Sequence, residues 1–179
     1  MCVILIGRIT RQQHELAKKQ NPDGFSMFTE ASGLVKAPKD WQVNAGLGQF
    51  GIWHYRIGTS GRMDKSNIHP FRVCKGKYLL YHNGVLGAGL GEMSDTRALA
   101  ETLYDLSLTT IRTVLESLKE RQRFVLVDAK DPTKFELFGA WSCESGVLMS
   151  HKLYTPVTTS TKTYKSLSQY SKGGCDYED

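Results

Sequence analysis

The hydrophobic and polar residues of this chain form a pattern that predicts strands towards both ends of the sequence and helices between them. Short apolar runs that are rich in β-branched residues and bounded by Gly, Pro, Asn or Asp are typical of strands. Runs of this kind are residues 2–9, 25–29, 51–57, 77–82, 123–129, 134–141 and 147–151. The first run is almost continuously apolar, which predicts a buried strand that starts at Cys2.

Helical periodicity is clearest in the middle of the chain. Leucines recur at helical spacing after Asp95, and apolar residues do so again over residues 111–118, so that both segments predict amphipathic helices. Residues 11–19 are polar and compatible with a helix, which would end at the Asn-Pro-Asp-Gly turn of residues 21–24.

The remaining segments lack a clear period. We expect residues 32–51 to be irregular, and residues 62–67 and 87–91 to be loops. The Ser/Thr/Lys-rich end beyond Leu153 is expected to be peripheral and mobile. Strands, then helices, then strands without strict alternation predict an α+β fold with largely antiparallel sheets.

Length and composition narrow the class of protein. A chain of 179 residues suits one domain with a substantial core, and 40% hydrophobic with 23% charged residues is typical of a soluble globular protein. No apolar stretch approaches the roughly 20 residues of a membrane span, and the first residues do not resemble a secretory signal. We therefore expect a cytoplasmic protein that does not enter a membrane. A net charge of +5 is modest for this size and gives little support to nucleic-acid binding.

Metal and cofactor chemistry receive no support from residue spacing. The four cysteines are widely scattered, and neither a zinc site nor a disulfide framework is expected. The five histidines lack the spacing of metal ligands, and no serine lies in a GxSxG motif. The glycine-rich loop at residues 87–91 lacks the lysine of a phosphate loop. We expect no metal and no cofactor.

Cys2 is a candidate nucleophile because loss of Met1 would leave it at the N-terminus. Its free α-amino group, with an ordinary pKa of about 7.7–8.0, would then lie within reach of the thiol and could take up its proton. The alternative is that Cys2 is a small apolar residue at the start of a buried strand.

Arg56 lies inside a strand-like segment, where a guanidinium could bind a carboxylate with help from the Thr59 hydroxyl. Taken alone, the segment favours the alternative that Arg56 points outward from a half-exposed strand.

Asn83 and Gly84 follow an apolar run and could form an oxyanion hole through a side-chain amide and a backbone N–H. The alternative is an Asn-Gly hairpin turn, which is the commoner use of this pair. Asp95 could hold an ammonium group, but taken alone its position before a helical run favours the alternative of an N-cap.

The order of these segments resembles one family, the glutaminase domain of the class II glutamine amidotransferases, which are N-terminal-nucleophile hydrolases. The motifs that carry the resemblance are Cys at position 2, NPDG, HYRIGTSG, NIHPF, YHNGV and SDT. The resemblance covers about residues 1–153 and leaves residues 154–179 as a peripheral segment of the same domain. It implies a four-layer αββα sandwich of two antiparallel sheets.

The resemblance also implies roles for the candidate residues. Cys2 would be the nucleophile, Asn83 and Gly84 the oxyanion hole, Arg56 and Thr59 the clamp on the α-carboxylate of L-glutamine, and Asp95 and Gly84 the site of its α-ammonium. The reaction would pass through a γ-glutamyl thioester and release ammonia without a cofactor. Relatives usually carry a synthase domain that uses the ammonia, so this chain is expected to work with a separate amidating partner. The alternatives are hydrolysis of another small amide or γ-glutamyl compound, and a non-catalytic binding module.

Overall fold

The computed structural model describes residues 2–38, 46–58, 61–87, 89, 91–153 and 162–165. Eleven described strands form two sheets, and every neighbouring pair is antiparallel. In order across the larger sheet, its strands are β11 (Lys162–Lys165), β9 (Ala140–Glu144), β10 (Val147–Met149), β1 (Val3–Arg8), β4 (Phe50–Arg56), β2 (Gly24–Thr29) and β3 (Gly33–Ala37). The smaller sheet has β5 (Phe71–Val73), β6 (Tyr78–Asn83), β7 (Arg123–Asp128) and β8 (Phe135–Phe138).

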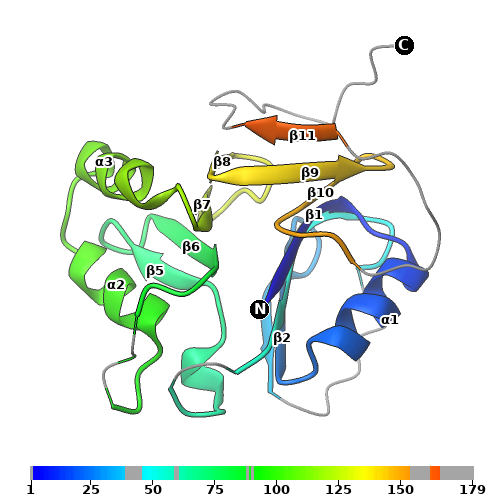
Figure 1. Ribbon diagram of the computed structural model, residues 1–179, viewed down its shortest axis with the longest axis horizontal. Helices are drawn as coiled ribbons and strands as arrows, with labels where there is room; N and C mark the ends of the chain where they lie inside the picture. The colour runs from blue at the N-terminus through cyan, green and yellow to red at the C-terminus, as the bar shows by residue number, and fades with distance from the viewer. Residues whose placement is uncertain are drawn as a thin grey trace.

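The two sheets lie face to face between helices (Figure 1). Helix α1 (Arg11–Gln20) covers the outer face of the larger sheet, and helices α2 (Asp95–Leu103) and α3 (Leu108–Leu118) cover the outer face of the smaller one. Three hydrophobic clusters fill the interfaces: one beneath α1, one between the sheets, and one beneath α2 and α3. The predicted α+β fold with an αββα sandwich is confirmed.

Strand alternation assigns side chains to these interfaces. Along β1, Val3 and Leu5 belong to the cluster beneath α1, whereas Ile4 and Ile6 belong to the cluster between the sheets. Side chains at every second position of a strand share a face. The even-numbered residues of β1 therefore face the smaller sheet.

Local capping explains where the helices begin. Thr10 caps α1 in a reciprocal capping box with Gln13, Ser94 caps α2, and Ser107 caps α3. Each cap hydroxyl accepts a hydrogen bond from a backbone N–H of the first turn, which has no partner within the helix.

Several predicted boundaries are wrong. Strand β3 lies inside residues 32–51, which were expected to be irregular. Strand β11, in the segment predicted to be peripheral, is the edge strand of the larger sheet and pairs with β9. The single strand predicted over residues 134–141 is divided at Gly139 into β8 and β9, which belong to different sheets. Gly139 has a φ of 91°, and a Cβ at this position would overlap the carbonyl oxygen of Gln122. The chain therefore crosses between the sheets at a position that only glycine fits.

Two further findings concern the expectations from composition. Cys2 and Cys74 are free cysteines, whereas Cys143 is disulfide-bonded, which residue spacing did not predict. Among the described residues, no helix is long and apolar enough to cross a membrane.

Candidate active site

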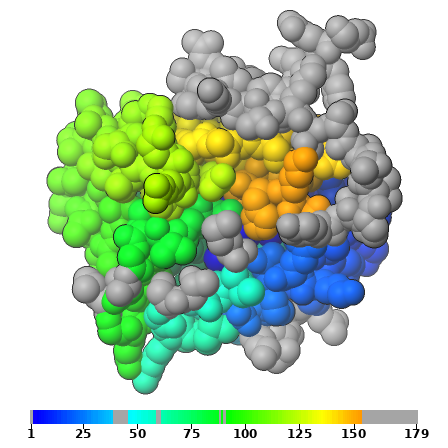
Figure 2. All heavy atoms as spheres, viewed as in Figure 1, coloured from blue at the N-terminus to red at the C-terminus, as the bar shows by residue number. Residues whose placement is uncertain are grey.

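Cys2, Arg56 and Asn83 reach the same end of the space between the two sheets. Cys2 shares the inward face of the first strand with Ile4, and Arg56 shares the inward face of β4 with Ile52. Asn83 ends β6 on the face that carries Tyr81. In the space-filling view, the dark blue start of the chain is visible between green and orange segments (Figure 2). Three segments that are distant in sequence therefore meet where the nucleophile was predicted.

The surroundings of Cys2 keep its thiol protonated at neutral pH. Continuation of the β1–β4 register places Cys2 opposite Arg56, and its Sγ donates to the Ile57 carbonyl oxygen at 3.6 Å. Burial raises the pKa of the Cys2 thiol, while the hydrogen bond to Ile57 and the charge of Arg56 partly offset that effect. A reaction at this sulfur therefore needs a base.

Arg56 is buried, with 3% of its surface exposed, so the outward-facing alternative is wrong. Its guanidinium donates to the Met63 Sδ at 3.6 Å and to the Arg62 carbonyl oxygen at 3.3 Å. The turn at residues 21–24 packs against the same segment, because Asp23 N–H donates to the Arg56 carbonyl and Asp23 Oδ2 accepts from Gly58 N–H, both at 2.9 Å. Thr59, the other residue predicted for the carboxylate clamp, lies outside the described residues.

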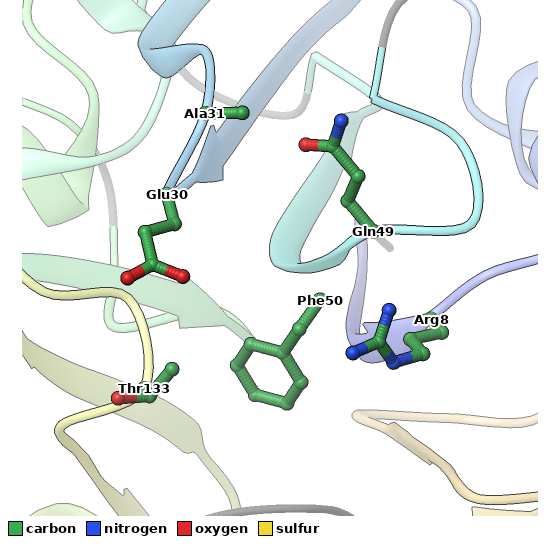
Figure 3. A pocket seen from close by; sticks show the side chains of 6 residues that line it. All are labelled: Arg8, Glu30, Ala31, Gln49, Phe50 and Thr133. Atoms are coloured by element: carbon green, nitrogen blue, oxygen red, sulfur yellow. The ribbon is translucent and has the colours of Figure 1, made fainter.

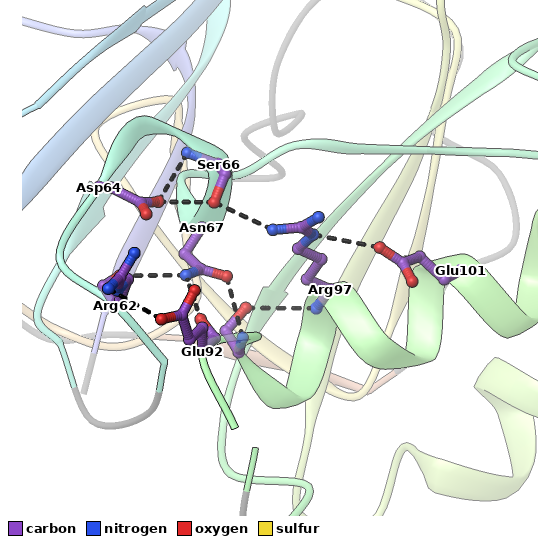
Figure 4. A network of polar contacts seen from close by, with 8 residues as sticks. Arg62, Asp64, Ser66, Asn67, Glu92, Arg97 and Glu101 are labelled. Atoms are coloured by element: carbon purple, nitrogen blue, oxygen red, sulfur yellow. Dashed lines mark hydrogen bonds and ion pairs between the residues drawn. The ribbon is translucent and has the colours of Figure 1, made fainter. Parts of the chain in front are cut away.

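Asn67 connects the Arg56 segment to the start of α2 (Figure 4). It is fully buried, and its side-chain amide donates to the carbonyl oxygens of Arg62 at 3.1 Å and Glu92 at 2.8 Å. Its Oδ1 accepts from Ser94 N–H at 2.9 Å. The Arg62 carbonyl thus receives hydrogen bonds from both Asn67 and Arg56. The sequence indicated Asn67 only as part of a motif, and the structure adds that it links two predicted substrate-binding segments.

Asn83 and Gly84 do not form a hairpin turn, because β6 pairs with β7 beyond α2 and α3. Asn83 is 1% exposed, and its Nδ2 lies 2.8 Å from Ser150 Oγ and 3.3 Å from His151 Nδ1. Its Oδ1 is buried and has no hydrogen-bond partner in the described part of the chain.

The backbone at Gly84 is tightly enclosed. A Cβ there would overlap the Gln122 side chain and lie 2.8 Å from His82 Nε2. Gln122 in turn bonds to His82 Nε2 and to the Val85 carbonyl, both at 2.9 Å. Any larger residue at this position would therefore require Gln122 or the loop to move.

Asp95 is the first residue of α2, but the N-cap is Ser94, so the alternative that Asp95 caps the helix is wrong. The Asp95 carboxylate accepts from Leu86 N–H at 2.9 Å and from Thr96 N–H at 2.7 Å. It thereby ties the loop after Gly84 to the same helix terminus that Asn67 ties to the Arg56 segment. The predicted site residues that the structure describes thus belong to one connected framework.

A layer of buried histidines lies beside these residues. The rings of His54 and His69 are 4.3 Å apart between centroids, and neither nitrogen of either ring has a partner among the described residues. Burial, aided by nearby positive groups such as Arg56, lowers the pKa of His54 to about 3 and that of His69 well below its ordinary value. His82 bonds to Thr96 and Gln122. No group of three or more possible metal ligands occurs within the described ranges.

Comparison with known proteins gives relatives of one kind. No family model matches the chain. The chain is 30% identical over 131 residues to a glutamine–fructose-6-phosphate aminotransferase (isomerizing) of Geobacillus kaustophilus. This match covers 62% of the chain and 21% of that protein. Enzymes of the same name from Bacillus licheniformis and Staphylococcus epidermidis are 35% and 33% identical over 68 and 66 residues, which is 37% of this chain and 11% of each relative.

The chain thus spans about a tenth to a fifth of the length of these relatives. The name that these relatives share includes glutamine, which agrees with the family that the motifs indicate. As its motifs predicted, this chain resembles the glutaminase domain of the class II glutamine amidotransferases.

Proposed function

We propose that this chain hydrolyses the side-chain amide of L-glutamine and releases ammonia. The observation that supports the proposal most is the convergence of a thiol, a buried guanidinium and a buried carboxamide at one end of the space between the sheets. These are the three groups that the reaction needs for attack, substrate binding and stabilisation of an oxyanion. The glutamine-dependent relatives support the same substrate.

The proposed reaction begins after Met1 has been removed. The α-amine of Cys2 accepts the proton of the thiol, and the sulfur attacks the side-chain carbonyl carbon of glutamine. The Asn83 amide and the Gly84 N–H stabilise the negative oxygen of the tetrahedral intermediate. As the C–N bond breaks, the protonated amine returns its proton to the leaving nitrogen, and ammonia departs. Water then attacks the γ-glutamyl thioester, restoring the thiol and giving glutamate.

The remaining site residues are proposed to hold the amino-acid end of glutamine. Arg56 binds the α-carboxylate, together with Thr59, because a guanidinium can form two parallel hydrogen bonds to a carboxylate. Asp95 and the Gly84 carbonyl receive the α-ammonium. The chemistry requires no metal and no cofactor, and we propose that the ammonia passes to a separate amidating enzyme.

Glutamine hydrolysis and covalent labelling test the proposal together. The wild-type protein is expected to release ammonia from glutamine, and a glutamine-like alkylating agent should add one adduct to a chain that lacks Met1 by intact mass. Cys2→Ala should abolish both the ammonia release and the adduct. Cys74→Ala is the matched control at a second free cysteine of the described residues and should retain both. Full activity in a protein that keeps Met1, or in Cys2→Ala, would contradict the mechanism.

Kinetics of two further variants test the assigned roles. Arg56→Ala should mainly raise KM for glutamine, because it removes the group that binds the carboxylate. Asn83→Ala should mainly lower kcat, by about 100- to 1000-fold, which is the usual effect of losing one oxyanion donor. The opposite pattern would mean that the two roles are wrongly assigned.

A further inference from the structure

Ser150 joins the two sheets beside the proposed oxyanion hole. Its backbone N–H donates to the Ile4 carbonyl at 3.0 Å, and its Oγ accepts from Ile4 N–H at 2.9 Å. The same Oγ lies 2.8 Å from the side-chain nitrogen of Asn83, which belongs to the opposite sheet. Ser150 is 2% exposed, so no solvent competes for these contacts. Ser150 therefore links the strand that follows Cys2 to the carboxamide of Asn83.

With the Asn83 side-chain nitrogen facing Ser150, one donor and one acceptor of these two side chains lack hydrogen-bond partners among the described residues. Ser150 Oγ receives two N–H groups, and within the described residues its own proton has no acceptor. The Asn83 Oδ1 is also buried, and none of the residues described in the structure is its hydrogen-bond partner. Leaving a buried polar atom unpaired opposes folding, so two such atoms on neighbouring side chains are unfavourable.

Rotating the Asn83 amide by half a turn pairs both of these atoms. The nitrogen and oxygen of a carboxamide have nearly the same shape, so the hydrogen-bond network must decide which is which. In the rotated form, the Ser150 hydroxyl donates to Oδ1 across the 2.8 Å contact while Oγ still accepts from Ile4. His151 Nδ1–H can donate to the same Oδ1 across the 3.3 Å contact. The two donors of Nδ2 then occupy the position that the unpaired oxygen holds otherwise.

We infer that Ser150 is a positioning residue that donates its hydroxyl proton to Asn83 Oδ1 and so presents Nδ2 as a free donor in the oxyanion hole. The inference rests on the proposed function, in which a negative oxygen forms beside Asn83. A donor that is already oriented needs no rearrangement when this charge develops. With the opposite orientation, Asn83 would present a carbonyl oxygen to the oxyanion and repel it.

Steady-state kinetics of Ser150 variants test the inference. In Ser150→Ala the hydroxyl donor is lost, and kcat for glutamine should fall about 10- to 100-fold, less than for loss of the oxyanion donor itself, while KM changes less than about twofold. Ser150→Thr keeps a hydroxyl and should retain most of kcat. Ser142→Ala is the matched control: its hydroxyl bonds to the Met149 carbonyl at 3.3 Å on the neighbouring strand, and kcat should not change.

Two readouts separate an orienting role from a merely structural one. Alkylation of Cys2 by iodoacetamide needs no oxyanion hole, so its rate should be the same in Ser150→Ala and in the wild type. A kcat for Ser150→Ala within twofold of wild type, or an equal loss in Ser150→Thr, would overturn the inference. So would a slower alkylation that accounts for the whole loss of kcat.

A neutron structure of the deuterated wild-type protein tests the orientation without any assay. Deuterium on Ser150 Oγ directed at Asn83 is expected, and deuterium on Asn83 directed at Ser150 would overturn the inference. Failure of the wild type to hydrolyse glutamine would instead refute the proposed function, and the neutron structure would still decide the orientation of the amide.

Discussion

The two ends of the space between the sheets are filled in different ways. Towards Arg8, Ile6 and Ile52 pack against aliphatic residues of the smaller sheet, and Phe50 stacks on Phe135 with ring centroids 6.3 Å apart. Beyond this end lies an exposed pocket of about 380 Å³, lined by residues of several loops and strand ends (Figure 3). Towards Cys2, the same faces of the same strands carry polar side chains instead.

Unpaired polar atoms are concentrated at the Cys2 end. The buried side chains that have nitrogen or oxygen atoms without a partner in the described part of the chain are Ser26, His54, His69, Tyr81 and Asn83. Burying such atoms opposes folding, whereas burying the aliphatic residues at the other end favours it. The comparison teaches that the apolar end holds the sheets together, which allows the other end to keep groups suited to chemistry.

The largest loss of stability is expected from a substitution at the apolar end of the space between the sheets. Ile52 is fully buried between the sheets, so Ile52→Ala should lower the free energy of unfolding by about 2–5 kcal/mol, because methyl groups are lost and a cavity remains. Denaturant unfolding measures this change. Leu34→Ala, at a residue 36% exposed on β3, is the control and should cost less than about 1 kcal/mol. Equal losses would mean that burial of Ile52 between the sheets contributes no more to stability than an exposed leucine does.

A smaller effect is expected at the loop after β6. Gly84→Ala places a Cβ where Gln122 lies, so the loop or Gln122 must move, and the free energy of unfolding should fall by about 1–3 kcal/mol. The double variant Gly84→Ala with Gln122→Ala removes most of the overlap and should lose less than the sum of the single variants. A strictly additive double variant would contradict the role of Gln122 in enclosing the loop.

The histidine layer predicts a dependence of stability on pH. The pKa of His54 is about 3 in the folded protein against an ordinary value of 6.5, so below pH 6.5 the unfolded chain binds a proton that the folded protein does not. His54 therefore makes its full contribution to the free energy of unfolding above pH 6.5. This contribution falls by about 1.4 kcal/mol for each pH unit below 6.5, down to about pH 3.

His54→Phe removes this linkage. Between pH 7.5 and 5.5 its free energy of unfolding should fall by about 1.4 kcal/mol less than that of the wild type. His151→Gln, at a half-buried histidine, should change the pH dependence less. An unchanged slope in His54→Phe would show that His54 titrates normally in the folded protein.

The sequence predicted most of the fold because burial imposes a period on the chain. Buried strands such as β1 and β4 are unambiguous in their hydrophobic pattern, and so are the amphipathic helices α2 and α3. Strand β3 was missed because it is a half-exposed edge strand, and β5 because it has only three residues. The division at Gly139 depends on a contact with Gln122, which no local pattern reveals.

The candidate site was predicted only in part, for a similar reason. Motifs indicated Arg56, Asn83 and Asp95, yet alternation alone favoured an exposed Arg56 that the structure shows to be buried. Ser150 carried no signal, because its contact with Asn83 joins residues 67 positions apart and on different sheets. Contacts of this kind come from the packing of the two sheets against each other.

The smallest changes in stability are expected from substitutions at two buried tyrosines, Tyr81 and Tyr55. Tyr81 lies between the sheets, where its hydroxyl has no hydrogen bond of good geometry to any described residue, although the Ser26 hydroxyl is near enough to offset part of the rise in the pKa of Tyr81 caused by burial. Tyr55 lies beneath α1, and its hydroxyl bonds to His14 Nδ1 at 2.9 Å. Both residues are fully buried.

Tyr→Phe at each position removes the same hydroxyl from different surroundings. Tyr55→Phe should lower the free energy of unfolding by about 1 kcal/mol, because it leaves His14 without this bond. Tyr81→Phe removes an unpaired polar atom and should be neutral or stabilising by up to about 1 kcal/mol. Thermal and denaturant unfolding measure both changes. A loss in Tyr81→Phe as large as that in Tyr55→Phe would mean that the polar end is satisfied after all, and that the two ends of the inter-sheet space differ in composition but not in energetic cost.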